Sequence, residues 1–277
     1  MNNSVNFTAS EASTNSTTQT IGLLESLEIC VYIINFLFGL PTHSYVLWLI
    51  ITGTGSGVAS EFFILNLSIC EIVNSLNSLF FVLLYWFSSV FILLVFLTGL
   101  SVTGCPLFQC LMCVERYLAV IHPVTFLKYK PLRYRVICCT VAWIIIFGSC
   151  LCSTLLASLN AYIWFISMQF LFFLHIQLFC LVAVLRALKQ SGPGARGRER
   201  EEENHMKRRA FYLILITTVN MVILYVPISI SALFTNLAKL NIQEVWYPSM
   251  ICYVLAGFVQ PVLYLHRNGK LFCFCSP

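Results

Sequence analysis

Seven long runs of apolar residues alternate with short polar connections along the 277-residue chain. A helix needs about 20 mostly apolar residues to cross the hydrocarbon core of a bilayer, and each run provides them. The pattern predicts spans at 23–51, 60–85, 89–121, 135–157, 163–188, 208–235 and 246–266. The expected fold is therefore an all-α membrane protein, a seven-transmembrane helix bundle (residues 23–266), and the rest of the chain is too short for a second domain.

The polar segments predict the loops and the tails of this bundle. Residues 1–22 form a tail rich in Ser, Thr and Asn, which we expect to be extracellular and glycosylated. Its three acceptor sequons begin at Asn2, Asn6 and Asn15. Residues 190–206 mix Gly, Pro and both charge signs, which is typical of a flexible third cytoplasmic loop. Residues 267–277 form a short cationic tail, which we expect in the cytoplasm.

Composition and charge agree with a membrane location and indicate its orientation. Hydrophobic residues make up 59% of the chain and charged residues 10%, whereas soluble domains average about 25% charged residues. If the apolar runs are spans, every Lys and Arg except Lys239 falls on one side. The positive-inside rule makes that side cytoplasmic and the N-terminus extracellular, as in a multi-pass protein of the plasma membrane. The net charge of +5 then reflects topology, and we expect no nucleic acid partner.

The third predicted span ends in the most informative segment, Cys113-Val-Glu115-Arg116-Tyr117-Leu-Ala-Val-Ile-His122-Pro123. Charged residues at the end of a span are costly, and they are found there when they have a use or can reach the headgroups. Pro123 is expected to stop the helix. The whole string resembles the Asp/Glu-Arg-Tyr motif of rhodopsin-like (class A) G-protein-coupled receptors.

Further segments resemble landmarks of the same family, in the same order along residues ~30–270. They are Gly39-Leu-Pro41-Thr-His43 in helix one, Leu65-Asn66-Leu67-Ser68-Ile-Cys-Glu71 in helix two, Trp143 in helix four, Leu224-Tyr225-Val226-Pro227 in helix six and Gln260-Pro261-Val-Leu-Tyr264 in helix seven. The tail resembles the family's short amphipathic eighth helix, with palmitoylation candidates at Cys273 and Cys275. The Gly-Leu-Pro segment and the many Phe and Cys residues are closest to the branch of purinergic, protease-activated and lipid receptors.

The resemblance implies a receptor that passes an extracellular or membrane-borne signal to a heterotrimeric G protein. The motif residues Glu115, Arg116, Tyr117 and Tyr264 would serve activation and coupling. Pro227 and Pro261 interrupt the backbone hydrogen bonds of helices six and seven, so they are candidate hinges. Tyr225 would sense the ligand, and Gln260 precedes the second hinge. Lys207 stands where many family members have an acid that holds Arg116, so we expect a different restraint on the inactive state.

The chain departs from the family pattern in the polar core. His43 and Glu71 replace the usual Asn and Asp, and Cys105 replaces a hydroxyl residue. By helix rise, His43 lies ~12 Å and Glu71 ~16 Å from the cytoplasmic ends of their helices. One hypothesis is that a protonated His43 pairs with Glu71 and replaces a bound sodium ion. The alternative is a neutral, hydrogen-bonded His43 beside a protonated Glu71.

The expected ligand pocket also differs from that of relatives. Phe91 stands where relatives have a disulfide-forming Cys, and the loop after helix four is too short to provide the partner. Thr98 stands where an amine receptor has an Asp in helix three, and no basic residue lies high in the bundle, so an amine or a nucleotide would have no charge partner. The pocket candidates are Thr98, Val102, Ala232 and Met250. Either an apolar ligand enters from the membrane lipid, or the receptor needs no conventional ligand.

Two alternative functions stay open at this point. One is a derived member of the same fold that is constitutively active or does not signal. The other is a small multispan transporter or channel, which would need several ionisable groups at mid-membrane or an inverted repeat. Neither metal-ligand spacing nor a nucleophile or phosphate motif appears, so we expect no enzyme activity, no metal site and no cofactor.

Overall fold

A computed structural model describes ten segments of the chain, and they contain most of the predicted spans. The described residues are 26–52, 58–84, 86–129, 132–155, 159–189, 207–208, 210–223, 226–227, 251–252 and 257–267. Several predicted features lie outside them: Asn2, Asn6, Asn15, Tyr225, Ala232, Met250, Cys273, Cys275, the 190–206 loop and the eighth helix.

The regular structure of the described part is helical. Its elements are η1 (Asn35–Gly39), α2 (Leu40–Ile51), α3 (Val58–Leu84), η2 (Ser88–Val90), α4 (Phe91–Ile121), α5 (Pro123–Tyr129), α6 (Leu132–Leu155), α7 (Leu159–Lys189) and α10 (Val259–Arg267). Five helices are long and apolar enough to cross a membrane: Ser26–Ile51, Glu61–Leu84, Phe91–Ile121, Leu132–Leu155 and Trp164–Lys189. Ala210–Ile223 is a shorter apolar helix within the sixth predicted span. The protein is a helical, multi-pass membrane protein.

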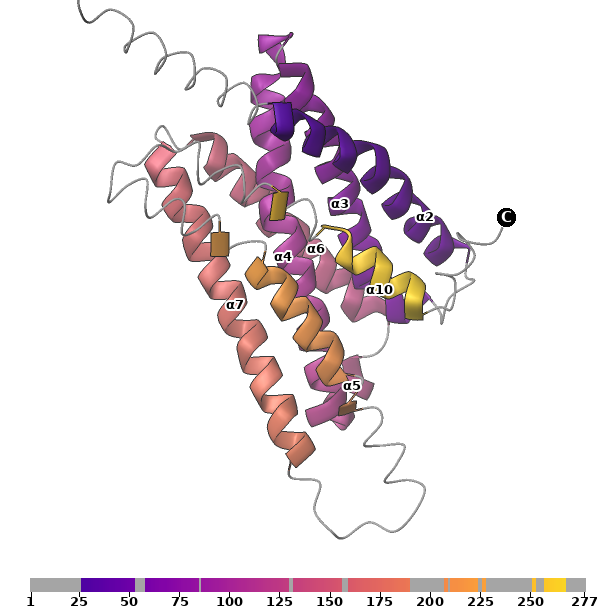
Figure 1. Ribbon diagram of the computed structural model, residues 1–277. Coiled ribbons are helices and arrows are strands. Elements are labelled where there is room, and N and C mark those ends of the chain that lie inside the picture. The colour runs from indigo at the N-terminus through magenta and orange to yellow at the C-terminus, as the bar shows by residue number, and fades with distance from the viewer. Residues whose placement is uncertain are drawn as a thin grey trace, which may run out of the picture.

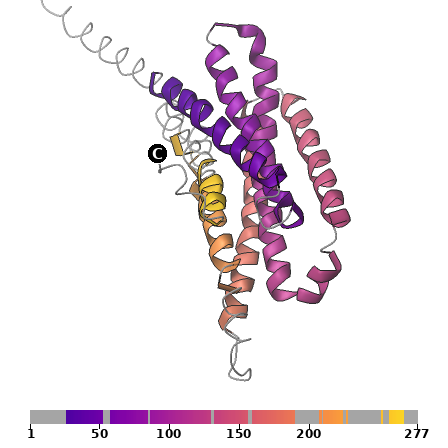
Figure 2. The ribbon, with the colours of Figure 1, turned by 90° about the vertical axis from the view of Figure 1, so that its right-hand side faces the viewer.

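Helix α4 is the centre of the described bundle. It packs against α3, α6 and α7, and α3 in turn packs against α2 (Figure 1). Helix α10 lies beside α2 (Figures 1 and 2). Because α4 contacts three long neighbours, its last two turns carry Glu115 and Arg116 to a place where several helices converge. We call this end of the bundle the Arg116 end.

Local chemistry ends α4 where the sequence predicts. The helix ends at Ile121, and its C-cap His122 leaves the helical region with φ −127° and ψ 63°. Pro123 lacks a backbone N–H and suits the first turn of a helix, and it begins α5. The sequence analysis expected a loop after Pro123 and missed this short helix.

The first span contains a π-helical turn that the hydropathy pattern did not indicate. The turn, η1, directly precedes Pro41 at the start of α2. Proline has no backbone N–H, and the missing hydrogen bond favours such a rearrangement of the preceding turn. The turn places the Asn35 Nδ2 2.7 Å from Ser78 Oγ, to which it donates a hydrogen bond. The irregular turn therefore joins the first span to α3.

Side-chain hydrogen bonds also join the helices to one another. Trp143 Nε1 of α6 donates to Asn66 Oδ1 of α3 over 2.9 Å. Gln169 of α7 accepts from Thr103 of α4 over 3.2 Å and donates to Ser149 of α6 over 3.0 Å. Such bonds inside a membrane average about 0.6 kcal/mol each, so their main effect is to fix which helix faces meet.

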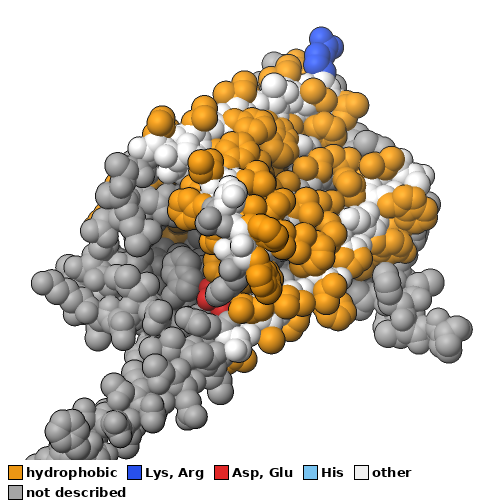
Figure 3. All heavy atoms as spheres, turned by 90° about the horizontal axis from the view of Figure 1, so that it is seen from above, with side chains coloured by type: hydrophobic (Ala, Val, Ile, Leu, Met, Phe, Trp, Pro, Cys, Tyr) orange, Lys and Arg blue, Asp and Glu red, His pale blue; other side chains and the backbone are white. Residues whose placement is uncertain are grey.

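The surface of the described bundle is strongly apolar. Figure 3 shows hydrophobic side chains over most of the described part of one face. Helix α6 alone exposes a set of large apolar residues, namely Val136, Ile137, Val141, Ile144, Ile145, Phe147, Leu151 and Leu155. Exposed apolar area of this extent would aggregate in water, and in a bilayer it faces lipid.

Gly104 gives a test of the α3–α4–α6 packing. A Cβ at this position would lie 2.8 Å from Cys70 Sγ and 3.5 Å from Ile146 Cδ1, whereas a Cβ at Gly148 meets nothing within 4 Å. Alanine favours a helix over glycine by about 1 kcal/mol. We expect Gly148→Ala to raise the thermal unfolding midpoint of the detergent-solubilised protein and Gly104→Ala to lower it. Equal shifts for the two variants would contradict this packing.

Candidate functional site

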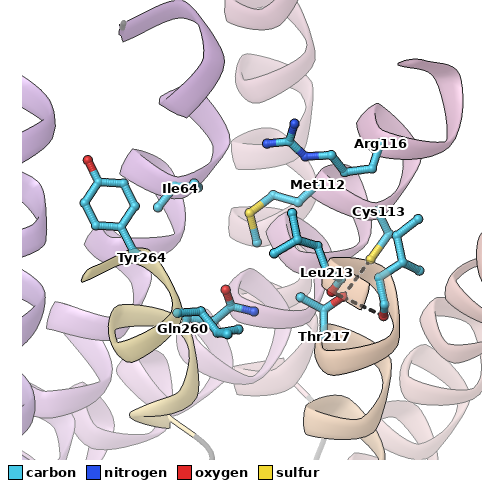
Figure 4. Close-up of a pocket in the computed structure, with 10 residues that line it drawn as sticks. Ile64, Met112, Cys113, Arg116, Leu213, Thr217, Gln260 and Tyr264 are labelled. Carbon is cyan, nitrogen blue, oxygen red and sulfur yellow. Dashed lines mark hydrogen bonds between the residues drawn. The ribbon is translucent and has the colours of Figure 1, made fainter. Parts of the chain in front are cut away.

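A narrow cavity lies at the Arg116 end, and several of the predicted motif residues line it. Its walls come from α3, α4, the Ala210–Ile223 helix and α10, and they comprise Ile64, Met112, Cys113, Arg116, Leu213, Ile214, Thr217, Gln260, Leu263 and Tyr264. Figure 4 shows Arg116 and Tyr264 on opposite sides of it, with the Tyr264 hydroxyl pointing away from the guanidinium. The fold thus brings together three residues predicted from two separate motifs, Arg116 from the third span and Gln260 and Tyr264 from the seventh.

The cavity is closed in this structure. Its volume is about 50 Å³, whereas an α-helix with side chains is about 10 Å across. Oγ1 of Thr217, in the Ala210–Ile223 helix (the sixth-span segment), lies 3.1 Å from Sγ of Cys113 in α4. This contact closes one side of the cavity. The cavity of this structure is thus too narrow for a helical protein segment.

Tyr264 is held by a buried carboxylate that the sequence analysis did not identify. Its hydroxyl donates a 2.8 Å hydrogen bond to Glu61 Oε2 of α3. The Glu61 side chain is 1% exposed and Tyr264 is 4% exposed. The bond joins the seventh predicted span to the start of α3. A Glu in the first turn of an apolar helix was the available signal, but its partner lies 203 positions away.

Glu115 pairs with a residue of the next long helix. The Arg135 guanidinium of α6 donates to the Glu115 carboxylate, and the two side chains are 7% and 11% exposed. The pair lies in the wall of a second cavity of about 280 Å³ whose other walls are mainly apolar, formed by Phe63, Leu111, Val114, Leu118, Phe126, Tyr134, Ile137 and Cys138. The sequence analysis considered Glu115 beside Arg116 and missed Arg135.

Tyr117 lies on another face of α4, away from the narrow cavity's lining. Its ring packs edge-on against His122 at a centroid distance of 5.8 Å and contacts Phe179 of α7 at 5.7 Å. It also packs against the small core cluster of Cys113, Cys180, Val184 and Ile214. Tyr117 therefore supports the contact between α4 and α7 in this structure.

The expected polar core residues are all buried, but they are not paired as hypothesised. His43, Glu71 and Cys105 are each 4% exposed. The Glu71 carboxylate accepts hydrogen bonds from the Cys105 thiol and the Asn74 amide, and a Cβ at Gly257 would lie 3.6 Å from its Oε2. His43 and Glu71 form no ion pair in this structure. The neighbours of Glu71 are instead α4 and the seventh predicted span.

The described part of the expected ligand pocket is occupied by contacts between helices. The Thr98 hydroxyl donates to Leu94 O over 2.8 Å and accepts from Asn77 Nδ2 over 3.1 Å. Val102 packs against the main apolar core. Phe91, at the start of α4, is 57% exposed. Of the hinge candidates, Pro227 is helical and half-buried, and Pro261 is buried in α10.

The Tyr264–Glu61 bond gives a stability prediction. Tyr264→Phe leaves a buried carboxylate without this donor, which costs about 1–3 kcal/mol. We expect a lower thermal unfolding midpoint for this variant than for Tyr212→Phe, whose parent side chain is 58% exposed. Indistinguishable midpoints for the two variants would show that the bond does not stabilise the closed cavity.

The Glu115–Arg135 pair gives a second prediction, for a double-mutant cycle. Glu115→Gln and Arg135→Gln each remove one member of a buried ion pair, and such losses cost about 3–5 kcal/mol. We expect the double variant to unfold at a higher temperature than either single variant, because it keeps neither charge of the pair. Additive losses in the cycle would contradict a direct pairing.

Comparison with known proteins gives an independent view of the chain. No family model matches it. Human chemokine XC receptor 1 is 26% identical over 268 residues, covering 87% of this chain and 77% of that receptor. A somatostatin-like receptor of Takifugu rubripes is 27% identical over 146 residues, or 50% of each chain. The G-protein coupled receptor homolog Q2/3L of sheeppox virus is 25% identical over 194 residues, covering 61% of this chain and 48% of that protein.

These relatives do not confirm the branch that the sequence analysis favoured. They are chemokine and somatostatin-like receptors, whereas the Gly-Leu-Pro segment and the Phe and Cys content suggested purinergic, protease-activated or lipid receptors. The helical bundle, the convergence of Arg116, Gln260 and Tyr264 on one cavity, and the relatives agree on the broader class. Together they support a G-protein-coupled receptor whose ligand these comparisons do not identify.

Proposed function

We propose that the Arg116 cavity is where the receptor binds a heterotrimeric G protein in the plasma membrane. The observation that carries the proposal is the convergence of Arg116 from α4, Thr217 from the sixth predicted span, and Gln260 and Tyr264 from α10 on one cavity. A cavity shared by several helices opens when one of them moves. The G-protein segment would then contact the Arg116 guanidinium and the Tyr264 ring.

Opening would be controlled by two hinge prolines and two restraints. Pro227 lies in helical backbone and Pro261 in the first turn of α10, and neither has an N–H to donate. They would serve as the points about which the two segments turn. The Tyr264–Glu61 bond holds α10 against α3, and the Cys113–Thr217 contact holds the sixth-span segment against α4. These two contacts take the place of the acid that relatives use to hold Arg116. Activation would break both.

Exposed basic residues support a cytoplasmic position for the Arg116 end. Arg133, Arg186, Lys189 and Arg208 are all exposed and lie at or near the helix ends on that side of the bundle. The positive-inside rule places such residues in the cytoplasm and the N-terminal tail outside. Cationic side chains near the last turn of α7 also suit the negative end of its helix dipole.

The relatives suggest which ligands to screen first. Two of them are named for chemokine and somatostatin recognition, so these ligand types come before amines and nucleotides. In the described residues, Thr98 stands in α4 where an amine receptor would need an acid, and its hydroxyl is already bonded within the bundle. The protein would transmit a signal and catalyse no reaction.

A basal assay of G-protein dissociation tests the coupling role of Arg116. The assay compares wild type with Arg116→Ala across the Gα types, at equal surface expression. We expect Arg116→Ala to remove most of the wild-type signal, because the guanidinium is the cationic group of the cavity wall.

Arg133→Ala is the matched control for this assay. It removes the same charge from an exposed position of α6 that does not line the cavity. We expect it to keep most of the signal. Equal signals from all three proteins, with a G protein that wild type activates, would overturn coupling through Arg116.

A further inference from the structure

Four amide side chains of the described bundle have unmet hydrogen-bonding groups, namely Gln260 in the narrow cavity and three others that are almost fully buried. Gln109 of α4 is 1% exposed, Gln177 of α7 is 0% exposed, and Asn220 of the Ala210–Ile223 helix is 2% exposed. Within the described part of the structure, Gln109 Oε1 and both polar atoms of Gln177 and Asn220 have no hydrogen-bond partner. A buried amide normally finds partners, so three such residues in one membrane protein require an explanation.

Helix periodicity places the three amides in one layer. Cys113, Cys180 and Ile214 form a packed cluster, and Thr217 contacts Cys113 directly. Gln109 lies four residues before Cys113, Gln177 three before Cys180, and Asn220 three after Thr217. Each step is one helical turn on the same face. Because the sixth span runs antiparallel to α4 and α7, all three steps lead away from the Arg116 end.

The layer lies across the seam that has to open. Gln109 and Gln177 belong to α4 and α7, which pack against each other. Asn220 belongs to the sixth-span segment, which also carries Thr217 in the wall of the narrow cavity. Movement of this segment away from α4 separates Asn220 from the other two residues. The seam would then widen enough for water, which satisfies amide groups almost as well as a protein partner does.

We propose that Gln109, Gln177 and Asn220 form a polar seam that favours the open bundle and gives the receptor activity without a ligand. This inference rests on the proposed function and identifies the residues that set the receptor's activity when no ligand is bound. An apolar layer at the same place would favour the closed bundle, because apolar side chains lose no hydrogen bonds when water leaves. The amides lose hydrogen bonds on closure and recover them on opening. The equilibrium therefore shifts toward the state that accepts a G protein.

Apolar substitutions in the seam test this inference. The variants are Gln109→Leu, Gln177→Leu and Asn220→Leu, and Gln109→Met replaces the first if it does not reach the cell surface. We expect each to lower basal G-protein dissociation about five-fold, the change that follows from one amide group left unsatisfied on closure. Each should also raise the thermal unfolding midpoint of the closed receptor.

Gln169→Leu is the matched control for these variants. Gln169 also lies inside the bundle, but its amide is bonded to Thr103 and Ser149. We expect Gln169→Leu to lower the unfolding midpoint, because it removes these bonds. It should not cause the loss of basal activity expected of the seam variants. If the seam variants raise basal activity or leave it unchanged while Arg116→Ala abolishes it, the polar seam is overturned and the coupling site stands.

Hydroxyl-radical footprinting gives a readout that does not require signalling. Met221 is 0% exposed and follows Asn220 directly, so it is labelled only where water reaches this layer. We expect labelling of Met221 in wild type and several-fold less in the double variant Gln109→Leu/Asn220→Leu. Equal labelling of Met221 in the two proteins would overturn the polar seam. This readout does not depend on signalling, so the absence of any G-protein response would count against the proposed function alone.

Discussion

A bilayer offers no hydrogen-bond partners, so each polar side chain of this protein has to find its partner on another part of the bundle. Most do. Asn35 bonds to Ser78, Trp143 to Asn66, and Gln169 to both Thr103 and Ser149. These bonds connect helices that hydrophobicity alone would not orient, because lipid is as apolar as the helix surfaces. The arrangement around α4 depends on them.

The same constraint explains how the Arg116 end is kept closed. Glu61 and Tyr264 satisfy each other in the interior, and Glu115 and Arg135 neutralise each other beside an apolar cavity. The Glu61–Tyr264 bond joins two helices that line the narrow cavity, whereas the Glu115–Arg135 pair joins α4 to α6, which does not line it. Two separate buried contacts thus hold this end of the bundle together.

Residues that escape the constraint are as informative as those that meet it. Gln109, Gln177 and Asn220 are buried amides with unmet groups at the seam between the sixth-span segment and the α4–α7 pair. A closed state with this composition is less stable than one with an apolar layer. The balance between bonded and unbonded amides then determines how readily the bundle opens.

Hydropathy and local residue chemistry were enough to predict the apolar helices, their order and the residues of the Arg116 motif. Hydropathy and the effect of proline act within a few residues, so the end of α4 at Ile121 was predictable from His122 and Pro123. The α5 helix and the η1 turn were missed, because weak local preferences are settled there by packing. The relatives, rather than the composition, indicated the chemokine and somatostatin-like receptors.

Which side chains become hydrogen-bond or ion-pair partners follows from the packing of the helices and could not be predicted from their spacing. Glu115 bonds to Arg135 across 20 positions and Tyr264 to Glu61 across 203. His43 and Glu71, for which the sequence left an ion pair and a neutral arrangement open, form no ion pair among the described residues. Sequence spacing gives the depth of a residue along its own helix, and it leaves the rotation of that helix against its neighbours open. Side-chain packing fixes this rotation, and with it which charges, amides and hydroxyls come within reach of one another.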